Sequence, residues 1–182
     1  MSNITLQNQT AYPAQFTVKK GEQVVVSLPA LESGQSVSIP TTDIYEVVAS
    51  TVIDGNTYSS APMTVTGATG FLAQVIQVYN QGTYVFDVQE VPSTASNQLQ
   101  FQSTWRDTVT FTIQKDGKPL QSVVCTDAFN MQTVTLSDTY SFQAIINGVT
   151  TATQYSGNSN ATCVAVNDTT LRDRGYYTLR LV

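Results

Sequence analysis

The chain has 182 residues, of which 41% are apolar and only 12% are charged. This charge content is about half that of a typical soluble domain, but the ordinary apolar content excludes disorder caused by high charge and low hydrophobicity. The net charge of −5 repels phosphates and argues against nucleic-acid binding. The chain contains no histidine, so the common general base and nearly all transition-metal sites are excluded. We therefore expect a protein that is not an enzyme and that holds no metal and no cofactor.

Apolar and hydroxyl residues alternate along most of the chain. The clearest runs, in chain order, are Gln15–Val18, Ser36–Ile39, Thr108–Ile113 and Thr133–Leu136. Such alternation is typical of strands with one buried face and one wet face. Asp54-Gly55 and Asn147-Gly148 each separate two alternating runs, and these dipeptides accept the positive φ angles of a tight hairpin turn. Because no segment has sustained helical periodicity, we predict an all-β fold.

The apolar pattern of the first half recurs in the second half. At a constant offset of 95 residues, Ile4 matches Leu99 and Phe16 matches Phe111. The same offset matches Leu6 with Phe101, Val18 with Ile113 and Tyr45 with Tyr140. These matched positions are those that would point into a core. The repeat predicts two tandem immunoglobulin-like or related β-sandwich domains that arise from an internal duplication.

The expected domain boundaries follow from this repeat. The first sandwich spans residues 1–91, the second spans 99–182, and the segment 92–98, which lacks alternation, is the linker. The alternative is that the copies pair their sheets into one continuous sandwich. Residues 1–91 hold two basic and seven acidic residues, whereas residues 92–182 hold six of each. The copies are therefore expected to present different faces to partners, although drift of solvated surface explains the same difference.

The two cysteines and the start of the chain bear on the compartment. Cys125 and Cys163 both lie in the second copy, where they form one disulfide in an oxidising compartment or remain buried thiols. They are too few for a structural zinc site. Residues 1–6 lack the features of a cleavable signal peptide, and no stretch has the length of a transmembrane helix. We expect a protein that is cytoplasmic or released by a non-classical route, unless a signal has been removed.

Trp105 and Arg106 are candidate ligand-binding residues. They lie in the first turn of the second copy, where the first copy has Thr10. A tryptophan in a polar turn is a natural stacking surface for a sugar ring or an anchor at a lipid headgroup boundary. The alternative is that Trp105 folds back over the domain end, since large aromatic side chains are mostly buried.

A second candidate site is the turn that holds Arg172, Asp173 and Arg174. Two arginines in one loop can grip a carboxylate or sulfate through bidentate hydrogen bonds, although such a triplet is more often a solvated turn. Asn167 and Asp168, together with Asp173, could supply oxygen ligands to calcium. Their order matches no known calcium loop, so no metal is predicted.

The stretch Ser59–Ala73 is nearly free of charge and rich in small and hydroxyl residues. Soluble pore-forming toxins release hairpins of similar composition to line a barrel. A plain strand, loop and strand of the sandwich explains the same residues. Because residues 156–160 of the second copy are equally polar, the loop interpretation is favoured.

These observations lead to three functional hypotheses. The first is a non-enzymatic binding or assembly protein, such as a lectin or adhesin, that acts through end loops on a glycan, a protein or a cell surface. The second is a membrane-disrupting toxin released without a signal peptide, the only case in which a membrane surface is a partner. The third is a structural subunit of a virion, fibre or inclusion that self-associates through edge strands.

Overall fold

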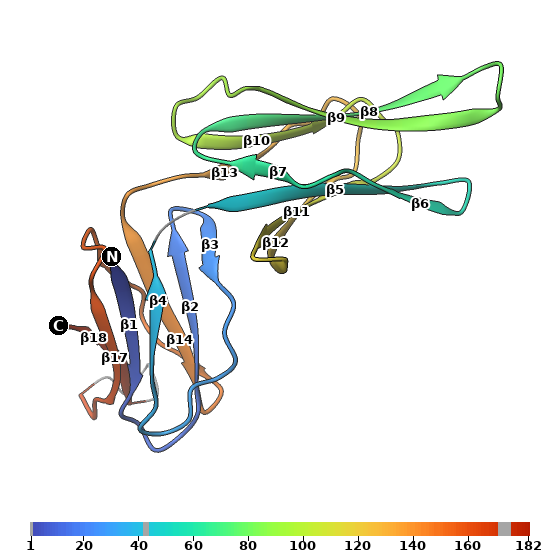
Figure 1. The fold of residues 1–182 in the computed structure, drawn as a ribbon. Helices are drawn as coiled ribbons and strands as arrows, with labels where there is room; N and C mark the ends of the chain where they lie inside the picture. The colour runs from blue at the N-terminus through green and yellow to red at the C-terminus, as the bar shows by residue number, and fades with distance from the viewer. Residues whose placement is uncertain (1, 42–43, 171–175) are drawn as a thin grey trace. The chain divides into compact units, whose positions relative to one another are not determined.

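The computed structural model describes residues 2–41, 44–170 and 176–182, and within these ranges every regular element is a β-strand (Figure 1). The all-β prediction is therefore confirmed. The chain divides into two compact units. Unit 1 comprises Met1–Thr42 and Ser137–Val182, and unit 2 comprises Asp43–Leu136.

Unit 1 consists of two sheets that enclose one core. One sheet has the order β18-β17-β1-β4, and the other has the order β15-β14-β2-β3, with β16 also paired to β14. Ile4 and Leu6 from the first sheet pack with Phe16 and Phe142 from the second. The strands are β1 (Asn3–Asn8), β2 (Ala14–Lys20), β3 (Gln23–Val26), β4 (Ser36–Pro40), β14 (Tyr140–Ile146), β15 (Val149–Thr150), β16 (Gln154–Ser156), β17 (Thr162–Asn167) and β18 (Tyr177–Leu181).

Unit 2 has the same two-layer organisation. One sheet has the order β13-β10-β8-β9, and the other has the order β12-β11-β5-β6, with β7 also paired to β5. Phe71 and Phe101 stack at a centroid distance of 5.5 Å in the core between the sheets. The strands are β5 (Tyr45–Ile53), β6 (Asn56–Ser59), β7 (Met63–Val65), β8 (Thr69–Val78), β9 (Thr83–Pro92), β10 (Gln98–Ser103), β11 (Val109–Lys115), β12 (Lys118–Cys125) and β13 (Gln132–Thr135).

Each strand pairing of unit 1 has a counterpart in unit 2. The parallel pair β1 with β17 corresponds to the parallel pair β10 with β8. The antiparallel pair β2 with β14 corresponds to β11 with β5. Even an irregularity recurs, because the register shifts between Val18 and Lys19 in unit 1 and between Ile113 and Gln114 in unit 2. The two units are therefore built on one framework.

The structure divides the chain at places other than the expected boundaries of 1–91, 92–98 and 99–182. Strands β1–β4 of the first half form unit 1 with β14–β18 of the second half, while β5–β9 and β10–β13 form unit 2. The segment expected to be a linker instead joins β9 to β10, which both pair with β8 in one sheet. The reason is that β10 takes its parallel neighbour from the other half of the chain.

The residue-level predictions of the repeat agree with the structure. The matched pairs Ile4 and Leu99, and Phe16 and Phe111, are at most 4% exposed. The two predicted hairpins also form, because Asp54 and Asn147 each have φ of 50° and are followed by glycines of positive φ. Alternation along the chain thus identified the buried faces correctly.

Two hairpins are longer in unit 2 than in unit 1. The β5–β6 hairpin has four paired positions, from Ser50 with Ser59 to Ile53 with Asn56, whereas β14–β15 has two. Strands β8 and β9 have 10 residues each, whereas β17 has 6 and β18 has 5. Figure 1 shows the long ribbons of β8 and β9. The common framework therefore carries different extensions.

The charge of the chain also differs between the units. Unit 1 contains five basic and five acidic residues, whereas unit 2 contains three basic and eight acidic residues. Unit 1 has no net charge, so unit 2 carries the whole net charge of −5. Cationic or uncharged ligands suit unit 2 better than polyanions.

Candidate functional site

The turn between β10 and β11 positions Trp105 and Arg106, the first predicted site residues. Ser103 ends β10, is fully buried, and its Oγ accepts a hydrogen bond of 2.9 Å from the backbone N–H of Trp105. Trp105 packs against the core of unit 2, and its ring centroid lies 6.4 Å from that of Tyr84 on β9. The indole is therefore held at the end of the sandwich and is only partly exposed.

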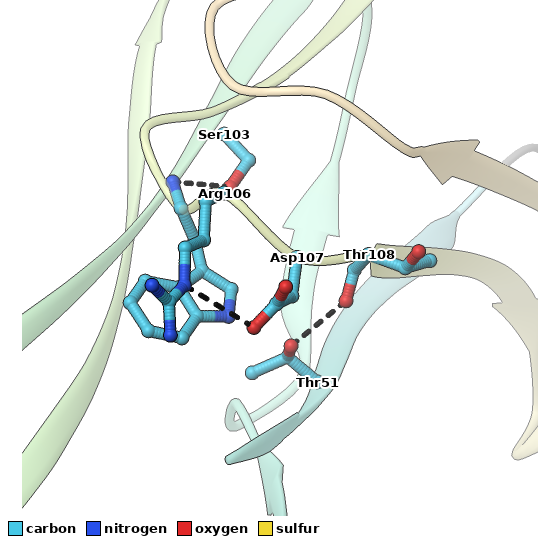
Figure 2. Close-up of polar contacts among 6 residues, drawn as sticks. Thr51, Ser103, Arg106, Asp107 and Thr108 are labelled. Atoms are coloured by element: carbon cyan, nitrogen blue, oxygen red, sulfur yellow. Dashed lines mark hydrogen bonds and ion pairs between the residues drawn. The ribbon is translucent and has the colours of Figure 1, made fainter.

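Arg106 covers the indole. Its Cζ lies 5.4 Å from the Trp105 ring centroid, a cation–π distance, and its Nε lies 3.7 Å from Asp107 Oδ2 (Figure 2). The Arg106 and Asp107 side chains are 82% and 58% exposed, so their ion pair contributes little to stability. Arg106 is thus free to exchange its partners for those of a ligand.

The Trp105 Nε1 atom is buried and has no hydrogen-bond partner among the described residues. A buried polar group without a partner costs free energy, so such groups are few in folded proteins. Among the buried side-chain nitrogen and oxygen atoms of the described residues, only this one and Gln23 Nε2 of unit 1 have no hydrogen-bond partner. Trp105 therefore offers more than a ring for stacking: Arg106 lies over this ring, and the indole N–H is a hydrogen-bond donor without a partner among the described residues.

An open groove of about 340 Å³ lies beside this turn. Thr51 anchors it, because Thr51 Oγ1 donates a hydrogen bond of 2.8 Å to the backbone oxygen of Thr108 (Figure 2). Five of its seven lining residues are serine or threonine, and Asp107 supplies one carboxylate. Its lining residues are Ser50, Thr51, Val52, Thr57, Asp107, Thr108 and Thr110.

Sequence reasoning missed Asp107 and the hydroxyl residues of β5 and β6. The longer β5–β6 hairpin supplies the hydroxyl residues, since Thr57 lies on the part of β6 that pairs beyond Thr51, whereas Asp107 lies in the turn between β10 and β11. A signal existed in the repeat, because Tyr45 and Asp54 are nine positions apart, whereas Tyr140 and Asn147 are seven positions apart. Two residues inserted into one copy of a repeat indicate a feature particular to that copy.

The corresponding turn of unit 1 is closed by a polar network. Asn8 and Thr10 are each 1% exposed, and Asn8 Nδ2 donates to the backbone oxygens of Tyr12 at 2.7 Å and Leu31 at 2.8 Å. Asn8 Oδ1 accepts from Thr10 N at 3.0 Å and from Thr10 Oγ1 at 2.7 Å. This turn uses its polar groups internally, so it is not a candidate binding site.

The second predicted site cannot be placed in the same way. Arg172, Asp173 and Arg174 lie outside the described residues. Asp168 is described, and its Oδ1 accepts from the N–H of Thr170 at 3.0 Å and the hydroxyl of Thr170 at 2.6 Å. The hydroxyl and then the N–H of Thr170 lower the pKa of this carboxyl group. Within the described ranges, no three acidic, cysteine or histidine residues gather in a way that could hold a metal.

The two cysteines are free and buried, and they belong to different units. Cys125 lies at the end of β12 in unit 2, and Cys163 lies in β17 of unit 1. Burial raises the pKa of Cys125 and raises that of Cys163 to about 12. Both thiols are therefore protonated and unreactive at neutral pH.

The uncharged stretch Ser59–Ala73 is part of the unit 2 sandwich. It contains β7 and the start of β8, and Val65, Phe71 and Ala73 are buried in the core. Releasing this stretch as a membrane hairpin would expose those side chains and remove the parallel neighbour of β10. The structure places it as strand, loop and strand.

None of the described residues forms a helix that is long and apolar enough to cross a membrane.

No protein-family model matches this chain, no curated protein matches it, and no solved structure matches its fold. The groove and the turn beside it are therefore interpreted from their own residues.

Proposed function

We propose that unit 2 is a non-enzymatic binding module that takes a hydroxylated saccharide in the groove beside Trp105, as a lectin or adhesin does. The observation that carries this proposal is the composition of the groove. Ser and Thr hydroxyl groups both donate and accept hydrogen bonds, as sugar hydroxyl groups do, and the Asp107 carboxylate accepts two or more. Most sites for small apolar ligands have apolar walls, so this lining favours a polar ligand.

The turn that supplies Asp107 and Thr108 to the groove also holds Trp105 and Arg106, which lie next to these residues in the chain but do not line the groove itself. If Arg106 turns away from the indole, one face of Trp105 becomes available to a sugar ring, which has apolar C–H groups on its faces. The Arg106 guanidinium then offers its donors to the hydroxyl groups of the ligand. A saccharide that is uncharged suits unit 2, whose acidic residues repel anions.

A glycan array followed by NMR titration of the 15N-labelled protein tests this proposal. Binding is expected to shift the amide signals of Thr51, Thr57 and Thr108. Thr57→Val and Asp107→Asn should each weaken binding by up to about tenfold, since each removes about one hydrogen bond. Thr150→Val is the matched control, because Thr150 has the same place in the β14–β15 hairpin of unit 1 as Thr57 has in β5–β6.

The result that would overturn the proposal is binding that Thr150→Val weakens as much as Thr57→Val does. An array without any ligand, combined with unshifted groove amides in mixtures of mono- and oligosaccharides, would overturn it as well. The indole fluorescence of Trp105 gives an independent readout, because it is the only tryptophan in the chain.

The β8–β9 hairpin favours assembly as a second function. Strand β10 pairs with β8 only from Gly70 to Ala73, so in the described pairings the rest of β8 pairs with β9 alone. Ile76 and Val85 face each other across this hairpin and are each 48% exposed, and Tyr79 at its tip is 85% exposed. A two-stranded ribbon with exposed apolar residues is marginal in water and gains from a partner. A Tyr79→Ser/Ile76→Thr variant should reduce any self-association measured by sedimentation.

We also infer that the two units arose by duplication of an immunoglobulin-like or related sandwich. The matched pairings, the matched register shift and the matched apolar positions support this origin.

A further inference from the structure

Unit 1 is assembled from the two ends of the chain. Its N-terminal segment, residues 2–41, and its C-terminal segment, residues 137–170 with 176–182, are held together by strand pairing and by the core. Strand β1 pairs with β17 over four positions, and β2 pairs with β14 over seven. Unit 2 is one continuous stretch between the two segments. Unit 1 can therefore open without any change in the pairing of unit 2.

Opening would expose two complementary half-sandwiches. Leu6 and Val18 on the N-terminal segment, and Phe142 and Cys163 on the C-terminal segment, are each at most 1% exposed in the closed unit. The free edges of β1 and β2 would also lose their backbone partners. A half-sandwich with an apolar face and unpaired edges binds most strongly the segment that it has lost.

Each unit already combines strands from both halves of the chain. The connection from β4 to β5 takes the first half out of unit 1 and into unit 2, and the connection from β13 to β14 takes the second half from unit 2 into unit 1. The two units have equivalent strand pairings although each is made of strands from both halves. A unit of this fold can therefore be formed by two segments that are not adjacent in the chain.

We propose that separate copies of this chain exchange their ends, so that the N-terminal segment of one copy completes unit 1 with the C-terminal segment of another. The partner is a second copy of this chain, and the exchanged unit has the same β1–β17 and β2–β14 pairs as the closed unit. Unit 1 has five basic and five acidic residues, so no net charge opposes the exchange. This assembly is independent of the groove on unit 2.

Connection length decides where exchange occurs. The two segments of unit 1 are joined only through the whole of unit 2, whereas residues 93–97 directly join β9 to β10 in unit 2. A short connection gives its ends a high effective concentration, on the order of millimolar for short flexible linkers, and a long connection gives less. Unit 2 should thus close on itself, while the segments of unit 1 exchange between chains at high protein concentration when they meet before unit 2 has folded, because the connection between them is then a flexible chain.

Single cysteine variants of the full chain test this proposal. Thr17 on β2 and Gln143 on β14 are register partners. Thr17→Cys is placed in one batch and Gln143→Cys in a second, 15N-labelled batch, both with C125A and C163A. The batches are mixed, unfolded, refolded at about 0.1 mM, which is roughly tenfold below the effective concentration within unit 2, and then oxidised. The expected product is an interchain disulfide between positions 17 and 143, identified by its isotope pattern in a digest.

The matched control lies at the same register in unit 2. Thr112 on β11 pairs with Val48 on β5 as Thr17 pairs with Gln143. Thr112→Cys and Val48→Cys in separate batches should give no more than a tenth of the interchain disulfide. Refolding at roughly thousandfold lower concentration should abolish the 17–143 bond between chains. Absence of that bond at high concentration, or equal cross-linking of the control pair, overturns the proposal.

Discussion

The turn after β1 in unit 1 differs from its counterpart after β10 in unit 2, although the strands around the two turns pair in the same way. In unit 1, Asn8 and Thr10 are buried, and the Asn8 side chain makes four hydrogen bonds: it donates two to backbone oxygens and accepts two from Thr10. In unit 2, Ser103 makes one such bond to Trp105, whose Nε1 has no partner among the described residues. The Asn8 side chain in the unit 1 turn uses its donors and acceptors within the turn and its surroundings, whereas the unit 2 turn has one indole donor without a partner among the described residues.

The two units also differ in the length of their hairpins and in their charge. Unit 2 has the longer β5–β6 and β8–β9 hairpins, the groove and the excess of acidic residues. Unit 1 has shorter hairpins and equal numbers of basic and acidic residues. It is also built from the N-terminal and C-terminal segments of the chain. We conclude that one framework can carry different roles in its two copies: we propose ligand binding and contacts of the β8–β9 hairpin for unit 2, and exchange of chain ends for unit 1.

The largest expected effect tests whether each unit is built from strands of both halves of the chain. A protease site inserted between Ala95 and Ser96 and then cleaved should leave one particle with the mass of the whole chain, 19.7 kDa, because each unit contains strands of both halves. Size-exclusion chromatography with light scattering measures this mass. Two separated particles of about half the mass would show instead that each half folds on its own. Denaturant should separate the cleaved pieces in either case.

Core substitutions at matched positions should destabilise one unit each. Phe101 and Leu6 are both fully buried and correspond in the repeat. Phe101→Ala should lower the free energy of unfolding of unit 2 by about 3–5 kcal/mol, and Leu6→Ala should lower that of unit 1 by about 2–5 kcal/mol. Trp105 fluorescence follows unit 2, and amide hydrogen exchange follows both units. Equal losses in both units from either variant would show that the units unfold together.

The two turns should respond unequally to loss of their polar side chains. Asn8→Ala leaves the backbone groups of Thr10, Tyr12 and Leu31 without this partner, so we expect a loss of about 1–3 kcal/mol in unit 1. Ser103→Ala removes one hydrogen bond and should cost about 0.5–1.5 kcal/mol in unit 2. Chemical denaturation followed by amide exchange measures both. A larger loss for Ser103→Ala would reverse the comparison of the turns.

The smallest effect is the response to alkaline pH. Burial raises the pKa of Cys163 in the folded protein to about 12, from the usual 9.0 that applies after unfolding. The unfolded chain therefore releases this proton first, so the contribution to stability is complete below pH 9 and is lost as pH rises toward 12. At pH 10 the loss should be about 1 kcal/mol. Cys163→Ala should flatten the pH profile of unit 1, and an unchanged slope would contradict the assignment.

The fold class and the core positions could be predicted because alternation is a local property. Val18 and Ile113 were placed in the core from the period of two in their own strands, and both are buried. Asp54-Gly55 and Asn147-Gly148 determine their hairpins because few other residues accept the φ angles that these turns have. Trp105 and Arg106 were predicted as site residues because an aromatic and a basic residue stand out in a polar turn, and they remain a prediction. Asp107 and Thr57 were missed because an ordinary polar residue has no local signal of the groove.

The sequence by itself determined that this protein is all-β, which faces of its strands are buried, where its hairpins turn and that one pattern occurs twice. Only the tertiary structure decided that β2 lies beside β14 rather than β5, and hence that each unit draws on both halves of the chain. The physical reason is that the repeat makes β5 and β14 alternative neighbours with the same apolar period, as the matched Tyr45 and Tyr140 illustrate. Alternation specifies which side chains are buried, but the choice between two equivalent strands depends on how the whole chain packs.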